Sequence, residues 1–199
     1  MKVFIATWNK KKIDEIKALL KDFEVLSIAD GINIPEVEEN SDTFEGNSQK
    51  KALEIAKFLN MVAIADDSGL MVDALEGEPG VYSARYAGEN ANDSDNNKKL
   101  IQNLKGIGNR KAKFVSVISV AKPNGEVHSF RGEVEGLILD EARGNSGFGY
   151  DPYFYYVAYG KTFAELELSE KNAISHRARA LSKMKKDIKT ALITGSTKG

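Results

Sequence analysis

The stretch VAIADDSGL at residues 62–70 constrains this chain most, because a short apolar run leads directly into two adjacent carboxylates, Asp66 and Asp67. Such a run predicts a buried strand that ends at the acids. In α/β proteins, metal-dependent chemistry is often placed at strand ends of this kind. The same polar residues could also form an ordinary solvated turn. The stretch therefore predicts an α/β fold and leaves the role of the acids to the rest of the sequence.

Three other polar clusters accompany this stretch. The segment TWNKKK, residues 7–12, directly follows the apolar run KVFIA, and GFGYDP (147–152) and SHR (175–177) come late in the chain. Each cluster alone is a weak signal, because short motifs occur by chance. Four clusters spread over the chain favour one site assembled by the fold.

The composition limits the class of protein. The 199 residues fit one domain, residues 1–199, that buries about 70% of its unfolded surface. The absence of cysteine excludes disulfides and thiolate metal sites, and two histidines make zinc an unfavoured metal. Without a membrane-spanning apolar run or a signal-peptide pattern, the expected location is the cytoplasm and no membrane partner is expected. The net charge of −1 offers no overall field for nucleic acid.

Apolar periodicity predicts helices that alternate with strands early in the chain and a hairpin late in the chain. The predicted strands cover residues 2–6, 62–67, 113–121 and 126–139, and the predicted helices cover residues 11–21, 43–59, 95–105 and 170–192. Asp42 and Ser169 are the expected caps of the second and the last helix. This order predicts an α/β fold with a mixed sheet.

Two segments lack a clear periodicity. Residues 77–93 are rich in glycine and polar residues, and they form either a surface loop or a wall of the site; the pattern does not decide which. Residues 194–199, TGSTKG, are small and polar, which predicts a disordered tail.

The first loop, residues 7–12, suits a polyphosphate. Asn9 and the backbone N–H groups at a helix start would present donors, and the helix dipole favours negative charge at the place where three lysines follow: Lys10, Lys11 and Lys12. The alternative is a solvated lysine run on a helix surface, and the segment lacks the glycine framework of a Walker loop. A triphosphate also needs a hard divalent cation, and Asp66, Asp67 and Glu45 are the candidate ligands.

The segment GFGYDP suits a flat ligand. Phe148 and Tyr150 alternate with Gly147 and Gly149, so an aromatic face could lie beside backbone that a nucleobase can approach, and Asp151 could accept a hydrogen bond from the base. The alternative is a glycine-hinged loop whose aromatic rings pack into the core.

The last cluster lies on the predicted C-terminal helix. His176 and Arg177 are adjacent and diverge by about 100° around the helix axis. Lys171 precedes His176 by five residues, a spacing that does not put both on one helical face. This cluster indicates a functional site only in combination with the other three clusters.

Together these segments resemble the inosine triphosphate pyrophosphatase family. The resemblance runs nearly end to end, through TWNKKK, TFEGNSQKKA, ADDSGL, GEPGVYSARYAG, GFGYDP, KTFAEL and EKNAISHRARAL in order. It implies a two-lobed α/β fold, with an elongated mixed sheet flanked by helices and the active site in the cleft between the lobes. It also implies hydrolysis of ITP, dITP and XTP to the monophosphate and pyrophosphate, with Mg²⁺ as cofactor and a homodimer as the assembly.

The resemblance assigns roles by motif position. Asp67 is the implied metal-linked catalytic residue and proton acceptor, with Ser68 beside it as a substrate contact. The implied triphosphate site is the first loop: Thr7, Trp8, Asn9, Lys10, Lys11 and Lys12. The implied nucleoside pocket is lined by Phe148, Gly149, Tyr150 and Asp151 and completed by Lys171, His176 and Arg177.

Two positions depart from the family pattern. The family usually has glutamate, a further metal ligand, where this chain has Gly46, so Glu45 is the nearest candidate although it points about 100° away on a helix. Trp8 replaces a small residue in the first loop. Two alternatives therefore stay open: a Maf-like pyrophosphatase of modified pyrimidine triphosphates, and a nucleotide-binding module without catalysis.

Overall fold

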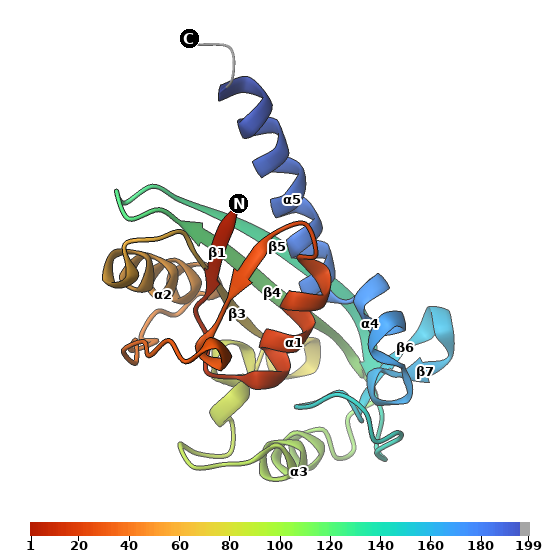
Figure 1. Ribbon diagram of the computed structural model, residues 1–199. Coiled ribbons are helices and arrows are strands. Elements are labelled where there is room, and N and C mark those ends of the chain that lie inside the picture. The colour runs from red at the N-terminus through yellow and green to blue at the C-terminus, as the bar shows by residue number, and fades with distance from the viewer. Residues whose placement is uncertain (196–199) are drawn as a thin grey trace. The chain divides into compact units, whose positions relative to one another are not determined.

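The computed structural model describes the backbone of residues 1–195 and the side chains of residues 1–188. The described residues form a seven-stranded sheet in the order β2-β1-β3-β4-β5-β6-β7 (Figure 1). Its strands are β1 (Lys2–Ile5), β2 (Glu24–Leu26), β3 (Ala63–Val72), β4 (Lys111–Ala121), β5 (Val127–Ile138), β6 (Phe154–Tyr156) and β7 (Lys161–Thr162). Strand β1 is parallel to β2 and β3, whereas β6 is antiparallel to β5 and β7. The predicted α/β fold with a mixed sheet is confirmed.

The helices are α1 (Lys10–Leu19), α2 (Phe44–Leu59), α3 (Asp93–Asn103), α4 (Leu168–Ile174) and α5 (His176–Gly195). The predicted hairpin joins β4 to β5, where the Lys122 N–H donates to the Glu126 carbonyl at 2.8 Å. None of the helices in the described part of the chain has the length and hydropathy needed to cross a membrane.

The chain divides into two compact units. Among the described residues, unit 1 contains 1–67, 116–132 and 176–195, and unit 2 contains 68–115 and 133–175. The boundary cuts strand β3 between Asp67 and Ser68, and it separates α4 from α5 between Ser175 and His176. The active-site cleft implied by the resemblance stays a prediction.

Unit 1 has two apolar layers because side chains alternate across a strand. Val3 and Ile5 of β1 pack with apolar residues of α1 and α5, whereas Phe4 and Ala6 pack with the apolar face of α2. Figure 1 shows α1 beside α5, with α2 on the other side of the strands. The sheet of unit 1 is therefore covered on both faces, which explains the continuous apolar run of β1.

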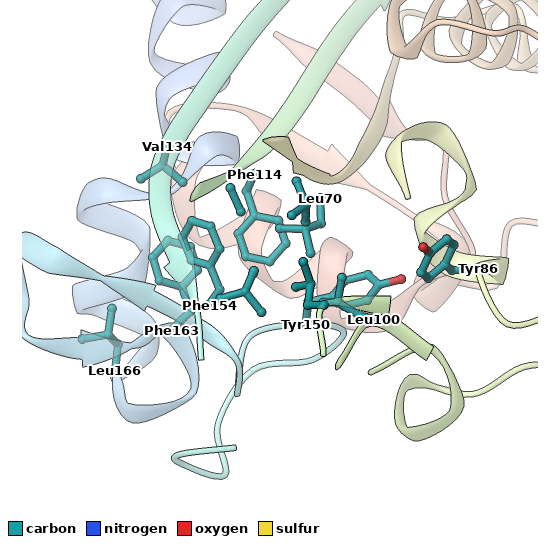
Figure 2. Close-up of a cluster of buried hydrophobic side chains, with 13 residues drawn as sticks. Leu70, Tyr86, Leu100, Phe114, Val134, Tyr150, Phe154, Phe163 and Leu166 are labelled. Carbon is teal, nitrogen blue, oxygen red and sulfur yellow. The ribbon is translucent and has the colours of Figure 1, made fainter. Parts of the chain in front are cut away.

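Unit 2 has an aromatic core. The rings of Phe114, Phe154 and Phe163 pack together, with centroids 4.4 Å apart for the first pair and 4.9 Å for the last (Figure 2). Leu70 and Val72 of β3 join the same cluster, together with Leu100 of α3 and Tyr150. Since Leu70 and Val72 are buried on one face, strand β3 continues well past the two aspartates.

The predicted end of β3 is therefore wrong. Asp66 and Asp67 lie in the interior of a ten-residue strand. The polar run DDSG resembles a turn in sequence, but the buried Leu70 beyond it and the hydrogen bond from its N–H to Ser83 Oγ keep the strand regular. Residues 77–93, left open by the pattern, include a 3-10 helix at Gly80–Arg85 that carries Ser83.

The predicted helix over residues 170–192 is two helices. Ser175 has extended backbone angles and ends α4, and α5 begins at His176. Ser169 lies inside α4, whose N-cap is Glu167, and the N-cap of α2 is Thr43 rather than Asp42. The apolar period runs on through the break, so the sequence pattern could not reveal it. Of the predicted tail, residues 194 and 195 end α5, and residues 196–199 lie outside the described residues.

Candidate functional site

The first loop forms the N-terminal cap of α1. The Asn9 side chain accepts a hydrogen bond from the Lys12 N–H at 3.2 Å, and Thr7 Oγ1 accepts one from the Asn9 N–H at 3.2 Å. Lys10 and Lys11 are exposed. The loop therefore holds a helix N-terminus and two solvent-facing cations directly after β1, as the phosphate-site hypothesis requires.

Asp66 is a fully buried carboxylate with charged partners on both sides. Its Oδ2 lies 2.7 Å from Lys12 Nζ and 3.2 Å from Arg177 Nη2, and its Oδ1 accepts a hydrogen bond from Ser116 Oγ at 2.5 Å. Burial alone would raise the pKa of Asp66, but the charges of Arg177 and Lys12 outweigh it and hold this pKa well below its ordinary value. Asp66 is therefore ionised and occupied by protein groups, which removes it from the candidate metal ligands.

Arg177 joins helix α5 to helix α1. Its side chain is 1% exposed, and Nη1 makes a short ion pair with Glu15, which is 3% exposed. Sequence analysis missed Glu15, because one glutamate in an amphipathic helix carries no signal by itself. We call the residues linked by these ion pairs the charge network: Lys12, Glu15, Asp66 and Arg177.

Asp67 differs from its neighbour. It is 5% exposed, and its Oδ2 is buried without a hydrogen-bond partner. Burial raises the pKa of Asp67 to about 6; the charge of Lys12 opposes the shift and that of Glu39 adds to it. A buried acceptor without a partner costs about 1–3 kcal/mol, so such a group in a folded protein calls for a function.

Glu39 is a second carboxylate whose charge acts on Asp67, and sequence analysis missed it. It lies in the segment before α2 and makes a short ion pair with Lys51 of α2. Within the described residues, no three His, Cys, Asp or Glu side chains form a metal cage. Magnesium usually takes one or two protein carboxylates and fills its shell with water and substrate oxygens, so Asp67 and Glu39 fit this ion.

Glu45 has a different partner. Its Oε1 accepts a hydrogen bond from Arg131 Nη1 at 2.9 Å, in the first turn of α2. The next residue, Gly46, is tightly packed, because a Cβ there would lie 2.0 Å from Ser41 Oγ. Of the two glutamates, Glu39 is the one whose charge acts on Asp67.

The aromatic loop, residues 147–151 of unit 2, is closed by Asp151. Asp151 Oδ2 accepts hydrogen bonds from the Phe148 N–H at 3.0 Å and from Lys171 Nζ at 2.7 Å. The Lys171 ammonium also lies 4.9 Å from the centroid of the Phe148 ring. Gly147 has a left-handed φ of 74°, and a Cβ there would meet Asp151 Oδ2 at 2.1 Å. The loop therefore places a half-buried ring, a buried cation and a carboxylate together.

Helix α3 holds the same loop at Gly149. The Gly149 N–H donates to Asp93 Oδ2 at 2.7 Å, and the Gly149 carbonyl accepts from Asn97 Nδ2 at 2.9 Å. Tyr150 is buried in the core of unit 2 and its hydroxyl donates to the Ser83 carbonyl at 2.7 Å (Figure 2). Tyr150 thus anchors the loop, whereas the Phe148 ring is only half-buried.

Three further predicted site residues are Trp8, Ser68 and His176. Ser68 is half-buried and follows Asp67 on β3, and His176 is buried at the start of α5. Trp8 is 52% exposed in the first loop. Lys171 and His176 belong to different helices, so their spacing in the sequence does not determine whether their side chains lie on the same side.

The features of this fold are those of an α/β protein that handles phosphate groups: a capped helix N-terminus after the first strand and a buried aspartate pair on a neighbouring strand. Its relatives make the class more specific. The Ham1 family model matches residues 3–187, and the chain belongs to the Ham1 family.

Three relatives illustrate the similarity. A dITP/XTP pyrophosphatase of Clostridium perfringens is 52% identical over 96% of this chain and 100% of its own length. The Ham1 protein of Staphylococcus aureus is 44% identical, with a TM-score of 0.86 over 96% of this chain and 100% of its own. A HAM1 protein of Coxiella burnetii is 38% identical, with a TM-score of 0.87 over 96% and 99% of the two chains. The predicted family is confirmed.

Proposed function

We propose that this protein hydrolyses ITP, dITP and XTP to the nucleoside monophosphate and pyrophosphate. The name of the Clostridium perfringens relative, dITP/XTP pyrophosphatase, supports the reaction. The observation that carries the proposal is Asp67, a buried carboxylate whose Oδ2 lacks a hydrogen-bond partner and whose pKa is raised to about 6. A base with a pKa near neutrality is suited to accept a proton from water.

The charges around Asp67 support a requirement for a divalent cation, for which we propose Mg²⁺. The carboxylates of Asp67 and of the two acids that act on it, Glu39 and Asp66, outnumber the two cations that act on it, Lys12 and Lys51. A triphosphate would add further negative charge to this excess. Asp67 and Glu39 would hold the ion, which would supply charge neutralisation on the phosphate oxygens.

The protein's own groups would position the reacting atoms. The first loop would bind the phosphate chain through backbone N–H groups at the start of α1, and Lys12 would offset charge on the leaving pyrophosphate. Asp67 would orient a water or take its proton as that water attacks the α-phosphorus. Positioning and electrostatics would supply most of the rate enhancement.

We assign the base to the aromatic loop of unit 2. The Phe148 ring offers a stacking face, and the Lys171 ammonium beside it, which also pairs with Asp151, could donate a hydrogen bond to a 6-keto oxygen. A 6-amino group in adenine would present N–H donors to this cation in place of an acceptor, so adenine would lose the contact. Arg177 is a weaker candidate for this contact, because its guanidinium pairs with Glu15 and Asp66.

Release of pyrophosphate from ITP, XTP, dITP, GTP, ATP and modified pyrimidine triphosphates, with and without Mg²⁺, tests the function. Fast turnover confined to ITP, XTP and dITP is the expected result. Turnover of modified pyrimidines would favour the Maf-like alternative, and binding without turnover would favour a non-catalytic module. The family relationship favours neither alternative.

Assembly and location are also proposals. The resemblance supports a homodimer that acts on a small nucleotide without nucleic acid or membrane partners, and the sequence supports a cytoplasmic location. Light scattering coupled to gel filtration tests the dimer.

A further inference from the structure

We propose that Glu15 is a positioning residue of the phosphate site. It holds one arm of Arg177, so that Asp66 stays shared between Arg177 and Lys12 and the Lys12 ammonium keeps its place in the first loop. The identity of the ligand rests on the proposed function, whereas the geometry rests on the ion pairs of unit 1.

The charge network alternates in sign. Glu15 pairs with Arg177, Arg177 with Asp66, and Asp66 with Lys12, and these pairs join helix α1, helix α5 and strand β3. Lys12 and Glu15 are three residues apart on α1, so their side chains leave the same face of the helix. One helical face thus offers one cation and one anion to the complementary pair formed by Asp66 and Arg177.

Glu15 affects Lys12 through an oxygen of Asp66 that Lys12 and Arg177 share. Lys12 Nζ and Arg177 Nη2 both contact Oδ2 of Asp66, at 2.7 and 3.2 Å. A guanidinium prefers to bind a carboxylate with two parallel hydrogen bonds. With the charge of Glu15 removed, Arg177 would be free to turn both arms toward Asp66 and compete with Lys12 for this oxygen.

Stability alone is a weak explanation for such a network. Two buried ion pairs carry large desolvation costs, and replacing buried pairs by apolar residues is often neutral or stabilising. Lys12, in contrast, belongs to the first loop at the start of α1, where the phosphate chain would bind. The network fixes the position of that ammonium, and the alignment of its charge-assisted hydrogen bonds to phosphate oxygens depends on that position.

The test compares Glu15→Gln with Asp14→Asn, which removes an exposed charge from the same helix. Trp8 is the single tryptophan of the chain and lies in the first loop, so its fluorescence reports binding of imidodiphosphate, a pyrophosphate analogue with a non-hydrolysable bridge. We expect Glu15→Gln to raise the Kd for imidodiphosphate and the KM for ITP by the same factor, about tenfold, the size of one misaligned charge-assisted hydrogen bond. Its kcat should change less, and Asp14→Asn should match the wild type.

Glu15→Asp keeps the charge on a shorter side chain and should restore part of the binding, which also covers the case that Glu15→Gln fails to fold. An unchanged Kd for imidodiphosphate in folded Glu15→Gln would overturn the inference. So would a Glu15→Asp variant that binds imidodiphosphate as weakly as a variant without the charge. Wild-type protein that does not bind imidodiphosphate would overturn it as well. Wild-type protein that binds imidodiphosphate but hydrolyses no nucleotide would refute the proposed function and leave the binding test of Glu15 in force.

Discussion

Asp66 and Asp67 are neighbours on one strand, yet their pKa values move in opposite directions. Burial raises the pKa of Asp67 to about 6, whereas the charges of Arg177 and Lys12 overcome the effect of burial at Asp66 and lower its pKa. Successive side chains point to opposite faces of a strand, so each carboxylate has its own surroundings. Pairs of acids separated in this way indicate different roles, here a permanent anion in the charge network and the proposed proton acceptor.

The pH dependence of catalysis should reflect Asp67. Since the proposed base must be ionised, kcat/KM should fall below about pH 6, and saturating Mg²⁺ should move this limb to lower pH because the cation binds the ionised form. Initial rates from pH 4.5 to 8 at two Mg²⁺ concentrations measure both effects. A limb that stays at the same pH at all Mg²⁺ concentrations would argue against Asp67 as a metal ligand.

Asp67→Asn should abolish turnover and stabilise the metal-free fold at neutral pH. The pKa of Asp67 rises on folding from 3.8 to about 6, so its stabilising contribution is complete below pH 3.8 and is lost as the pH rises through 6. Removing the charge should therefore add about 2–3 kcal/mol to the free energy of unfolding at pH 7 and little at pH 4. Urea unfolding at both pH values is the measurement. Residual turnover near the wild-type rate would refute the catalytic assignment.

Arg177→Ala should destabilise the fold strongly. It would leave the buried carboxylates of Glu15 and Asp66 short of a counter-charge, which costs about 3–5 kcal/mol. Arg179→Ala, two residues later and exposed, is the matched control. If Arg177→Ala keeps the wild-type stability and loses only the preference for ITP over ATP, Arg177 reads the base, as the sequence first suggested.

Phe148→Ala should weaken nucleotide binding selectively. Loss of a stacking ring is worth about 1–3 kcal/mol, so the KM for ITP should rise about tenfold or more, whereas the Kd for imidodiphosphate, which has no base, should not change. Tyr159→Ala removes another exposed ring of unit 2 as a control. Equal losses for both ligands would mean that Phe148 supports the fold rather than the base.

Glu39→Gln should raise the Mg²⁺ concentration for half-maximal activity about tenfold or more, as is usual when a metal site loses a supporting carboxylate. Glu45→Gln should have little effect, because Glu45 pairs with Arg131 and is not among the charges that shift the pKa of Asp67. Mg²⁺ titrations of both variants at fixed ITP give the comparison. The reverse order of effects would restore Glu45 as the ligand.

The sequence predicted the local features of the fold well. The hairpin of β4 and β5, the helices α1 to α3 and the first loop follow from apolar periodicity and turn chemistry within short windows. The same windows failed where tertiary contacts decide. The DDSG run reads as a turn until Leu70 is known to be buried, and the break at Ser175 is hidden because the helical period continues through it.

The candidate site shows the same limit. Asp67 and the first loop could be found because their types and order are distinctive. Glu15 could not, since its partner Arg177 lies 162 residues away, and Glu39 could not, since it is one of several carboxylates in residues 36–42. Which of these acids acts on Asp67 is decided by the path of the chain before α2.

The packing of Ser41 against Gly46 has a consequence for how such sites can change. A glutamate at position 46 would need the space that Ser41 fills, and Ser41 belongs to the segment that carries Glu39. Gly46→Glu alone would therefore displace Ser41 and disturb the segment that carries Glu39. An engineer who wants to move the ligand should transplant residues 38–47 as a block.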